Sequence, residues 1–172
     1  MIFSGECNRS EILEVYVDSD WAGCKSTRKS TSGGLAVWNQ GLIKSWSRTQ
    51  GTVAISSGEA EFYAALKGVA EGLGIQSLMR DMGIVVRIEV HQDSTAAKGT
   101  LSRSGIGKIK HLDTDFLWVQ ETVKKRGVRL LKIDGKENPA DILTKPSSIQ
   151  EVGRRMHQRI KYEIIEKSRG SV

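Results

Sequence analysis

The sequence has few cysteines, no long apolar segment and no internal repeat, and each shortage narrows the class of protein. Only Cys7 and Cys24 occur in 172 residues. They are too few for a disulfide framework and stand in no metal-ligand spacing, so we expect free thiols in a reducing compartment. No apolar run approaches 18 residues, and the first residues lack the charged start and hydrophobic stretch of a secretion signal. We therefore expect an intracellular protein, cytoplasmic or nuclear, that is not secreted and has no membrane partner.

Length limits the number of domains, and charge indicates the kind of partner. With 172 residues, 38% of them hydrophobic, the chain can bury a core but is hardly long enough for two ordinary domains. Its formal charge of +6 favours polyanionic partners such as nucleic acids. Between residues 94 and 136, lysines and arginines outnumber acids by ten to four, a density that suits contacts with phosphates. For the basic residues at 124–126, a solvated helix face is an equally good explanation.

The order of local patterns predicts an α/β fold with a mixed sheet of five strands flanked by helices. Alternating segments rich in β-branched residues indicate the strands, and they lie at 12–17, 33–38, 42–48, 85–90 and 128–133. A tight turn at 39–41 joins the second strand to the third, which gives three antiparallel strands at the start. Helices are expected after Ser56 or Ser57 as N-cap, at 94–101, at 112–126 and from Pro139 onward.

Four carboxylates stand where these predicted elements begin or end. Asp18 and Asp93 follow strands, whereas Glu61 and Asp141 lie near helix starts. Hard divalent cations such as Mg²⁺ take oxygen ligands, and a cluster of carboxylates is how proteins hold them for phosphodiester chemistry. The pattern therefore predicts a metal-dependent nuclease.

Each acid also has an ordinary structural explanation. Asp20 lies two residues beyond the first acid and would share its strand face, so spacing alone does not choose between them. Glu59 and Glu61 point about 200° apart on a helix, so only one of them faces the site and the other suits the helix dipole. Asp93 could cap the following helix, and Asp141 could interact with a helix dipole.

Five longer segments narrow the prediction further. They are Tyr16 to Gly23, Arg28 to Gly34, Ser56 to Tyr63, Lys110 to Asp113 and Asn138 to Pro146. Together, in this order, they resemble the RNase H domain that ends Copia-type retrotransposon polyproteins, which implies the ribonuclease H-like fold. The resemblance covers residues 13–146 and leaves 1–12 as an N-terminal extension. The basic tail at 147–172 could dock as an amphipathic helix or could equally be a frayed terminus.

The resemblance implies hydrolysis of the RNA strand in RNA–DNA hybrids by a two-metal-ion mechanism, with Mg²⁺ or Mn²⁺ as cofactor. By family position, Asp18 would bridge both ions, Glu61 and Asp93 would complete one site, and Asp141 would hold the other. Asp20 is left with a supporting role. The implied partners are the hybrid and a reverse transcriptase polymerase domain. We expect either a polyprotein fragment or a freestanding derivative, and the Met start and complete set of acids suit the latter.

One feature departs from the family pattern. Cellular RNases H carry a histidine in the loop before the last catalytic aspartate, but residues 134–138 contain none. His111 is the obvious replacement for a proton-transfer or product-release role, although we favour a structural role for it at a helix start. His91 precedes Asp93 by two residues and could support the site from the same strand face.

Substrate contacts are predicted from residue type and position. Small polar groups beside the acids, at Ser57, Gly58 and Ser94, could meet the 2′-hydroxyls that distinguish RNA from DNA. Basic side chains in the charged region could contact phosphates without reading the base sequence. The residues expected to do so are Lys98, Arg103, Lys108 and Lys110.

Three functional classes are consistent with these segments. An active hybrid-specific endonuclease requires all four acids, and all four are present. A catalytically weak module that binds nucleic acid or a polymerase would be expected to have lost one of them. A DNA transposase or integrase on the same fold would use two aspartates followed by a glutamate on a late helix, but here the glutamate comes second. The endonuclease is therefore the preferred prediction.

Overall fold

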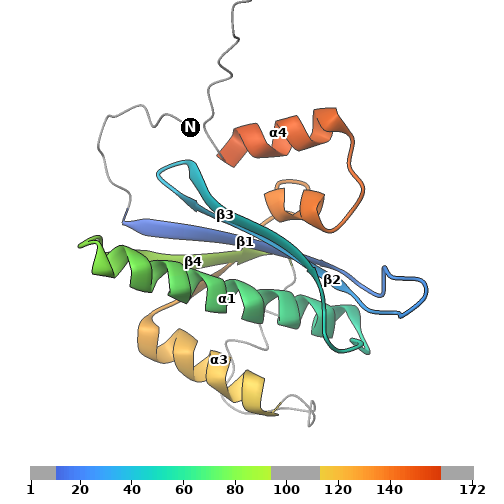
Figure 1. Cartoon of the computed structure of the whole chain (residues 1–172), viewed down its shortest axis with the longest axis horizontal. Helices are drawn as coiled ribbons and strands as arrows, with labels where there is room; N and C mark the ends of the chain where they lie inside the picture. Colours follow the sequence, from blue (N-terminus) through green and yellow to red (C-terminus); the bar gives the residue numbers. More distant parts are fainter. Residues whose placement is uncertain (1–10, 94–112, 160–172) are drawn as a thin grey trace, which may run out of the picture.

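A mixed sheet of five strands, in the order β3-β2-β1-β4-β5, forms the centre of the computed structural model, which describes residues 11–93 and 113–159 (Figure 1). The middle strand β1 pairs antiparallel with β2 and parallel with β4. The strands are β1 (Ile12–Asp20), β2 (Thr31–Trp38), β3 (Gly41–Thr49), β4 (Arg87–Gln92) and β5 (Arg129–Lys132). The predicted α/β class, with its mixed sheet that begins with three antiparallel strands, is confirmed.

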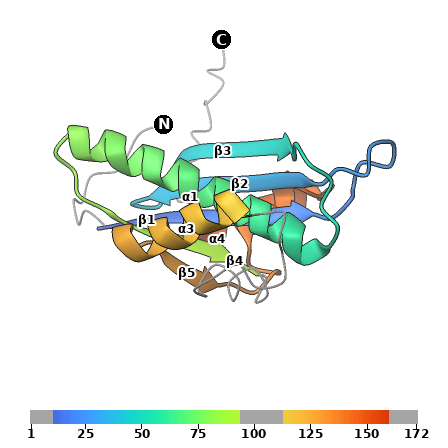
Figure 2. The ribbon, with the colours of Figure 1, turned by 90° about the horizontal axis from the view of Figure 1, so that it is seen from below.

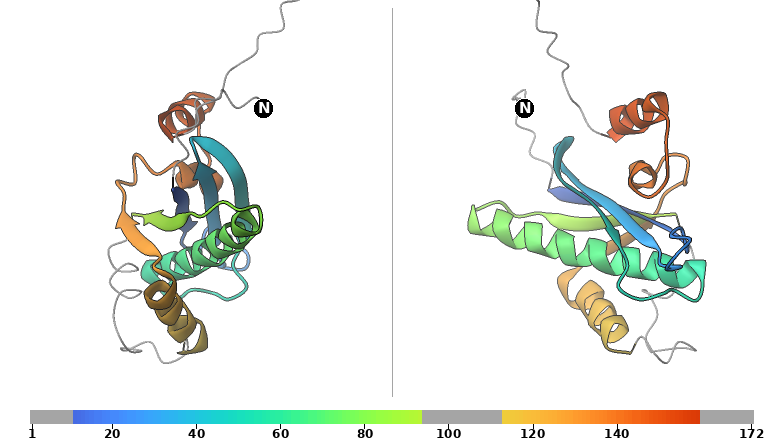
Figure 3. Two further views of the ribbon diagram at one scale, coloured as in Figure 1. Left: turned by 90° about the vertical axis from the view of Figure 1, so that its left-hand side faces the viewer. Right: turned by 45° about the vertical axis from the view of Figure 1, so that its right-hand side comes forward.

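Helices cover both faces of this sheet. Figure 1 and the left view of Figure 3 place α1 and α3 on one face and α4 on the other, and Figure 2 views the sheet from the side of α1 and α3. The short helix η2 contacts β1, β2 and α4. The bounds are α1 (Ser57–Asp81), α3 (Asp113–Arg126), the 3₁₀ helix η2 (Pro139–Leu143) and α4 (Ile149–Arg159). None of the helices in the described ranges is long and apolar enough to cross a membrane.

Alternation along β1 creates two cores, one on each face. Leu13, Val15 and Val17 pack with α1, α3 and β4 in the larger cluster. Tyr16 points to the other face, where it packs with residues of β2 and with Ala140 of η2. Because side chains alternate along a strand, Asp18 follows Tyr16 to the face of η2. The register of β1 therefore decides where this acid points.

Several predicted boundaries shift in the structure. The β2–β3 turn forms as predicted, with Asn39 and Gln40 both at positive φ (51° and 62°), as a two-residue hairpin turn requires. The fourth strand begins at Arg87 rather than at Val85, which is 80% exposed because it lies in the connection after α1. Part of the predicted tail is the helix α4, and its Met156 packs against the smaller core. The predicted helix at 94–101 lies outside the described residues.

Two glycines set how closely α1 approaches the sheet. A Cβ atom at Gly68 would lie 2.4 Å from Cγ1 of Val17, and one at Gly72 would lie 3.1 Å from Cγ2 of Ile88. The first separation is shorter than real Cβ contacts and the second is tighter than most of them, so larger residues would push the helix away from β1 and β4. Gly74, on the same helix, has open space around it.

We predict opposite effects of alanine at two positions of α1. Gly68→Ala should destabilise the fold by about 1–3 kcal/mol because its methyl group overpacks against Val17. Gly74→Ala, the matched control, should stabilise it by about 0.5–1 kcal/mol because alanine is the better helix former. Urea denaturation of both variants measures the difference, and equal effects would show that α1 does not depend on a close approach at Gly68.

Candidate metal centre

Asp18 lies near the end of β1 and is almost fully withdrawn from water, with 2% of its surface exposed. The hydroxyl of Thr144 donates a hydrogen bond to its Oδ2 atom, and Nζ of Lys145 is 3.7 Å from the same atom. Both Thr144 and Lys145 directly follow η2 in the chain. This segment can approach Asp18 because Gly33, the residue paired with Asp18 on β2, has no side chain. A Cβ atom there would lie 2.7 Å from Cγ2 of Thr144.

Asp93 directly follows β4, the parallel neighbour of β1. The carboxyl ends of adjacent parallel strands meet at the same edge of a sheet, where α/β proteins commonly bind ligands. This topology brings Asp93 toward Asp18. Gly135 lies beside the acid, and a Cβ atom at that position would be 3.0 Å from Oδ2 of Asp93.

Glu61 reaches the same edge from the first turns of α1. Ser56 caps the helix by accepting a hydrogen bond from the backbone N–H of Glu59, whose own carboxylate accepts one from Ile55. Glu59 is therefore used at the helix start, as predicted. Ser19 donates to Oε1 of Glu61 at 2.9 Å. The Oε2 atom of Glu61 is buried and accepts no hydrogen bond from the part of the chain that the structure describes.

Three of the four predicted acids form one cluster. Asp18, Glu61 and Asp93 each offer a carboxylate oxygen, and these oxygens lie within 4.8 Å of one another. Such a set fits a hard divalent cation, which prefers oxygen ligands. The buried Oε2 atom of Glu61 supports the fit, because a buried polar atom without a partner is costly unless a ligand satisfies it.

Asp141 approaches from η2 and lies outside that three-residue cluster. Asn138 caps η2 and also donates from Nδ2 to the backbone oxygen of Val17 at 2.9 Å, which fixes η2 beside Asp18. Two cations hold the Asp141 carboxylate: Lys145 contacts Oδ1, and Nη1 of Arg155 lies 3.0 Å from Oδ2. The negative charge of Asp141 raises the pKa of Asp18, so the two acids interact.

Burial and mutual repulsion shift the pKa values of these groups. Burial raises the pKa of Asp18 above its ordinary value, and hydrogen bonding to Thr144 and the charge of Lys145 oppose the rise only in part. Burial, followed by repulsion from Asp18, raises the pKa of Glu61 to about 8. The pKa of Lys145 is raised because its contact with Asp141 and its attraction to Asp18 outweigh the opposing effect of burial. Without a cation the carboxylates are thus poorly compensated.

Some of the remaining predicted site residues lie within the described ranges, and the others lie outside them. Asp20 accepts a hydrogen bond from the backbone N–H of Thr31, so it closes the β1–β2 pair and stands apart from the acid cluster. His91 stacks on Tyr16 with ring centroids 4.7 Å apart. At the start of α1, Ser57 is exposed and Gly58 is half-buried. Ser94, Lys98, Arg103, Lys108, Lys110 and His111 lie outside the described residues.

Sequence reasoning missed four residues that contact the acids. Lys145 stands four residues after Asp141 at helical spacing, a signal that could have been used. Thr144 and Ser19 lie within two of the five quoted segments, but nothing in their spacing indicates a hydrogen bond to an acid. Arg155 lies in the tail and gives no sequence signal, because only the packing of α4 brings it to Asp141.

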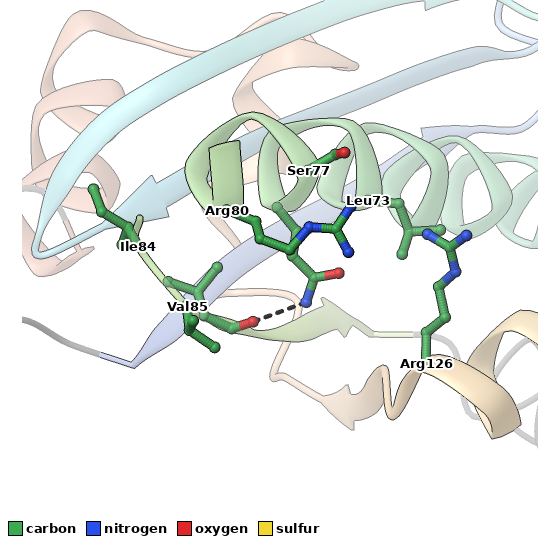
Figure 4. A pocket seen from close by; sticks show the side chains of 8 residues that line it. Leu73, Ser77, Arg80, Ile84, Val85 and Arg126 are labelled. Atoms are coloured by element: carbon green, nitrogen blue, oxygen red, sulfur yellow. Dashed lines mark hydrogen bonds between the residues drawn. The ribbon is translucent and has the colours of Figure 1, made fainter. Parts of the chain in front are cut away.

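One cavity among the described residues lies away from these acids. It has a volume of about 470 Å³ and lies beside the last turns of α1, whereas Glu61 lies near the first. In Figure 4, Arg80 of α1 and Arg126 of α3 border this cavity. Gln76, which also lines the cavity, donates a hydrogen bond to the backbone oxygen of Val86. This cavity is not part of the candidate metal centre.

Comparisons with known proteins give relatives in sequence and in fold. No protein-family model matches the chain. The retrovirus-related Pol polyprotein from transposon TNT 1-94 of Nicotiana tabacum is 32% identical over 148 residues, 83% of this chain. That from transposon RE1 of Arabidopsis thaliana is 30% identical over 139 residues, 79% of this chain. The chain spans only 11% and 10% of their lengths, about a tenth of each polyprotein.

Solved structures share the fold. LC11-RNase H1, isolated from compost by a metagenomic approach, superposes with a TM-score of 0.61 at 18% identity, covering 77% of this chain and 92% of that one. The sheet order and this superposition thus define the ribonuclease H-like fold. Together with the polyprotein relatives, they place the chain in the family of RNase H domains of Copia-type retrotransposon polyproteins.

We predict that the metal-free protein loses stability as pH rises from about 4.5 to about 8. A carboxyl group whose pKa is higher in the folded state binds its proton more tightly there than in the unfolded chain. Its contribution to stability is therefore complete below the unfolded pKa and is lost as pH passes the folded pKa. Glu61→Gln, which stays neutral, should remove most of this decline.

Urea denaturation in EDTA, below and above this pH range, tests the prediction. Above the range, Glu61→Gln should be more stable than the unsubstituted protein by more than about 1 kcal/mol, which corresponds to about one pKa unit. Equal pH dependence in both proteins would contradict a strongly raised pKa at Glu61.

Proposed function

We propose that this domain hydrolyses the RNA strand of RNA–DNA hybrids with the help of divalent cations held by Asp18, Glu61, Asp93 and Asp141. The observation that carries the proposal is the convergence of three carboxylates from β1, α1 and the end of β4 within 4.8 Å. LC11-RNase H1 has also been solved with an RNA/DNA hybrid, at a TM-score of 0.55 to this chain. The polyprotein relatives support a retrotransposon origin.

In this proposal each acid has a defined part. Asp18 is central because it lies between the Glu61–Asp93 side and the Asp141 side, and the Thr144 hydroxyl fixes its carboxylate. Two Mg²⁺ ions, or Mn²⁺ in their place, would supply the Lewis acidity that phosphodiester hydrolysis requires. Lys145, whose side chain is half-exposed, balances the charge of Asp18 and Asp141 until a cation is bound.

Substrate contacts are proposed from position and charge. Ser57 and Gly58 lie four and three residues before Glu61 at the start of α1, so they could meet the sugar edge of a strand held at the acids. Ser94 and the basic residues Lys98, Arg103, Lys108 and Lys110 follow Asp93 in the chain and are proposed to contact the hybrid and its phosphates. We further propose that the domain works beside a reverse transcriptase polymerase domain, which adds affinity for the hybrid.

Cleavage of an end-labelled RNA strand tests the proposal. The strand is presented as RNA–DNA hybrid, RNA duplex or single strand, with Mg²⁺, Mn²⁺ or EDTA. The proposal expects cutting of the hybrid alone, and only with a metal. Binding of the hybrid without cutting under any of these conditions would indicate a binding module that has lost activity or requires its polymerase.

We predict that removing the charge of any one proposed ligand abolishes cleavage. The variants Asp18→Asn, Glu61→Gln, Asp93→Asn and Asp141→Asn should each lower the rate by at least about 100-fold because cation binding is lost. Hybrid binding, measured by fluorescence anisotropy, should largely survive because contacts to phosphates supply most of the affinity.

Asp20→Asn is the matched control. Asparagine can still accept the hydrogen bond from Thr31, and the residue lies apart from the acid cluster, so cleavage should stay close to that of the unsubstituted protein. Loss of activity in Asp20→Asn together with full activity in Asp18→Asn would move the assignment to Asp20.

A further inference from the structure

Arg155 connects the C-terminal helix α4 to the last proposed metal ligand. Its Nη1 atom lies 3.0 Å from Oδ2 of Asp141, 3.0 Å from the backbone oxygen of Asn138 and 3.1 Å from that of Gly135. The arginine is only 6% exposed, although it comes from a helix at the edge of the fold. One guanidinium thus holds three acceptors between residues 135 and 141.

Those three acceptors belong to the segment that shapes the metal centre. Gly135 lies against the carboxylate of Asp93. Asn138 caps η2 and fastens it to the backbone of β1 one residue before Asp18. Asp141 is itself a proposed ligand. A guanidinium is suited to this task because its Nη1 atom contacts all three acceptors while Nη2 and Nε remain available to pair with an acid on α4.

The two cations on Asp141 differ in surroundings. Lys145 contacts Oδ1 from a half-exposed position and is also 3.7 Å from Asp18, so it stands on the side of the other acids. Arg155 contacts Oδ2 with a side chain that is only 8% exposed. An arriving cation can therefore replace Lys145 at Oδ1 while Arg155 keeps its hold on Oδ2.

We propose that Arg155 is a positioning residue that orients Asp141 for cation binding, so that α4 is a working part of the metal centre. This inference rests on the proposed function, because it assigns Arg155 to the same site. Arg155 touches neither substrate nor reacting atoms and acts only through Asp141 and the 135–141 segment.

The charge of Arg155 does not argue against this role. A lone positive charge beside a metal ligand would repel the cation, but Glu151, one turn earlier on α4, neutralises it. Oε1 of Glu151 accepts hydrogen bonds from Nη2 at 2.8 Å and from Nε at 3.2 Å. The pair is thus close to neutral, and the orientation of Asp141 is the larger effect.

The test measures Mg²⁺ binding directly, by isothermal titration calorimetry on the full chain. Arg155→Met should weaken Mg²⁺ binding by about 10-fold or more, the usual cost of losing a group that orients a metal ligand. Arg155→Lys should recover little of the loss, because one ammonium nitrogen cannot contact Asp141 and the two backbone oxygens and also pair with Glu151. In cleavage assays, the Mg²⁺ concentration for half-maximal rate should rise by the same factor.

Met156→Ala is the matched control for the docking of α4. Met156 neighbours Arg155 and packs on the smaller core. Its loss should loosen α4, while Mg²⁺ affinity stays within about twofold of the unsubstituted chain because Asp141 keeps its partners. Equal weakening in Arg155→Met and Met156→Ala would overturn the proposal, since Arg155 would then act only by holding α4 in place. Unchanged affinity in Arg155→Met would also overturn it.

Hydrogen exchange on the unsubstituted protein keeps the proposal testable if Arg155→Met does not fold. Coupling between two sites is reciprocal, so if α4 orients a cation ligand, cation binding must stabilise α4. Added Mg²⁺ should slow amide exchange in both 139–143 and 149–156. Slowing confined to 139–143 would overturn the proposal. Failure of the unsubstituted protein to bind Mg²⁺ or to cleave the hybrid would instead refute the proposed function itself.

Discussion

Repulsion between carboxylates that are held close together and away from water is the constraint on which the rest of the site depends. Asp18 is almost fully buried. The burial of Glu61 itself, followed by repulsion from the charge of Asp18, raises the pKa of Glu61 to about 8. The protein offsets part of this cost with the Thr144 hydroxyl and with two cations on Asp141. The buried Oε2 atom of Glu61 has no such compensation in the described chain. A site with this imbalance favours a divalent cation, which neutralises several acids at once.

The fold tolerates this arrangement because the acids come from separate, rigid elements. Asp18 and Asp93 stand at the carboxyl ends of two parallel neighbours, and Glu61 is held by a capped helix that packs closely on β1 through Gly68. On the opposite face, Gly33 leaves the room that lets η2 reach Asp18. Ordinary packing thus places the ligands, and the hydrophobic cores on both faces provide the stability that offsets the repulsion.

Local signals in the sequence were sufficient for the strands, whereas the choice among the acids depended on the resemblance to a known family. Alternation predicted the sheet, and turn residues predicted the β2–β3 hairpin, because both are determined by neighbouring residues. Spacing could not separate Asp18 from Asp20, since both carboxylates suit a strand end; the structure separates them because Asp20 binds the backbone at Thr31. The role of Arg155 was not predictable, because its contact with Asp141 requires α4 to fold back onto η2.

A crystal structure of the chain with Mn²⁺, located by its anomalous scattering, would show whether the acids form a metal centre. We expect a Mn²⁺ peak bonded to carboxylate oxygens of Asp18, Glu61 and Asp93. Asp141 should face a second cation position beside Asp18, whereas Asp20 should bind no cation. The peak should disappear in Asp18→Asn. Mn²⁺ bound only elsewhere, with Lys145 still paired to Asp141 and no ion among the acids, would contradict the claim that this cluster is a metal centre.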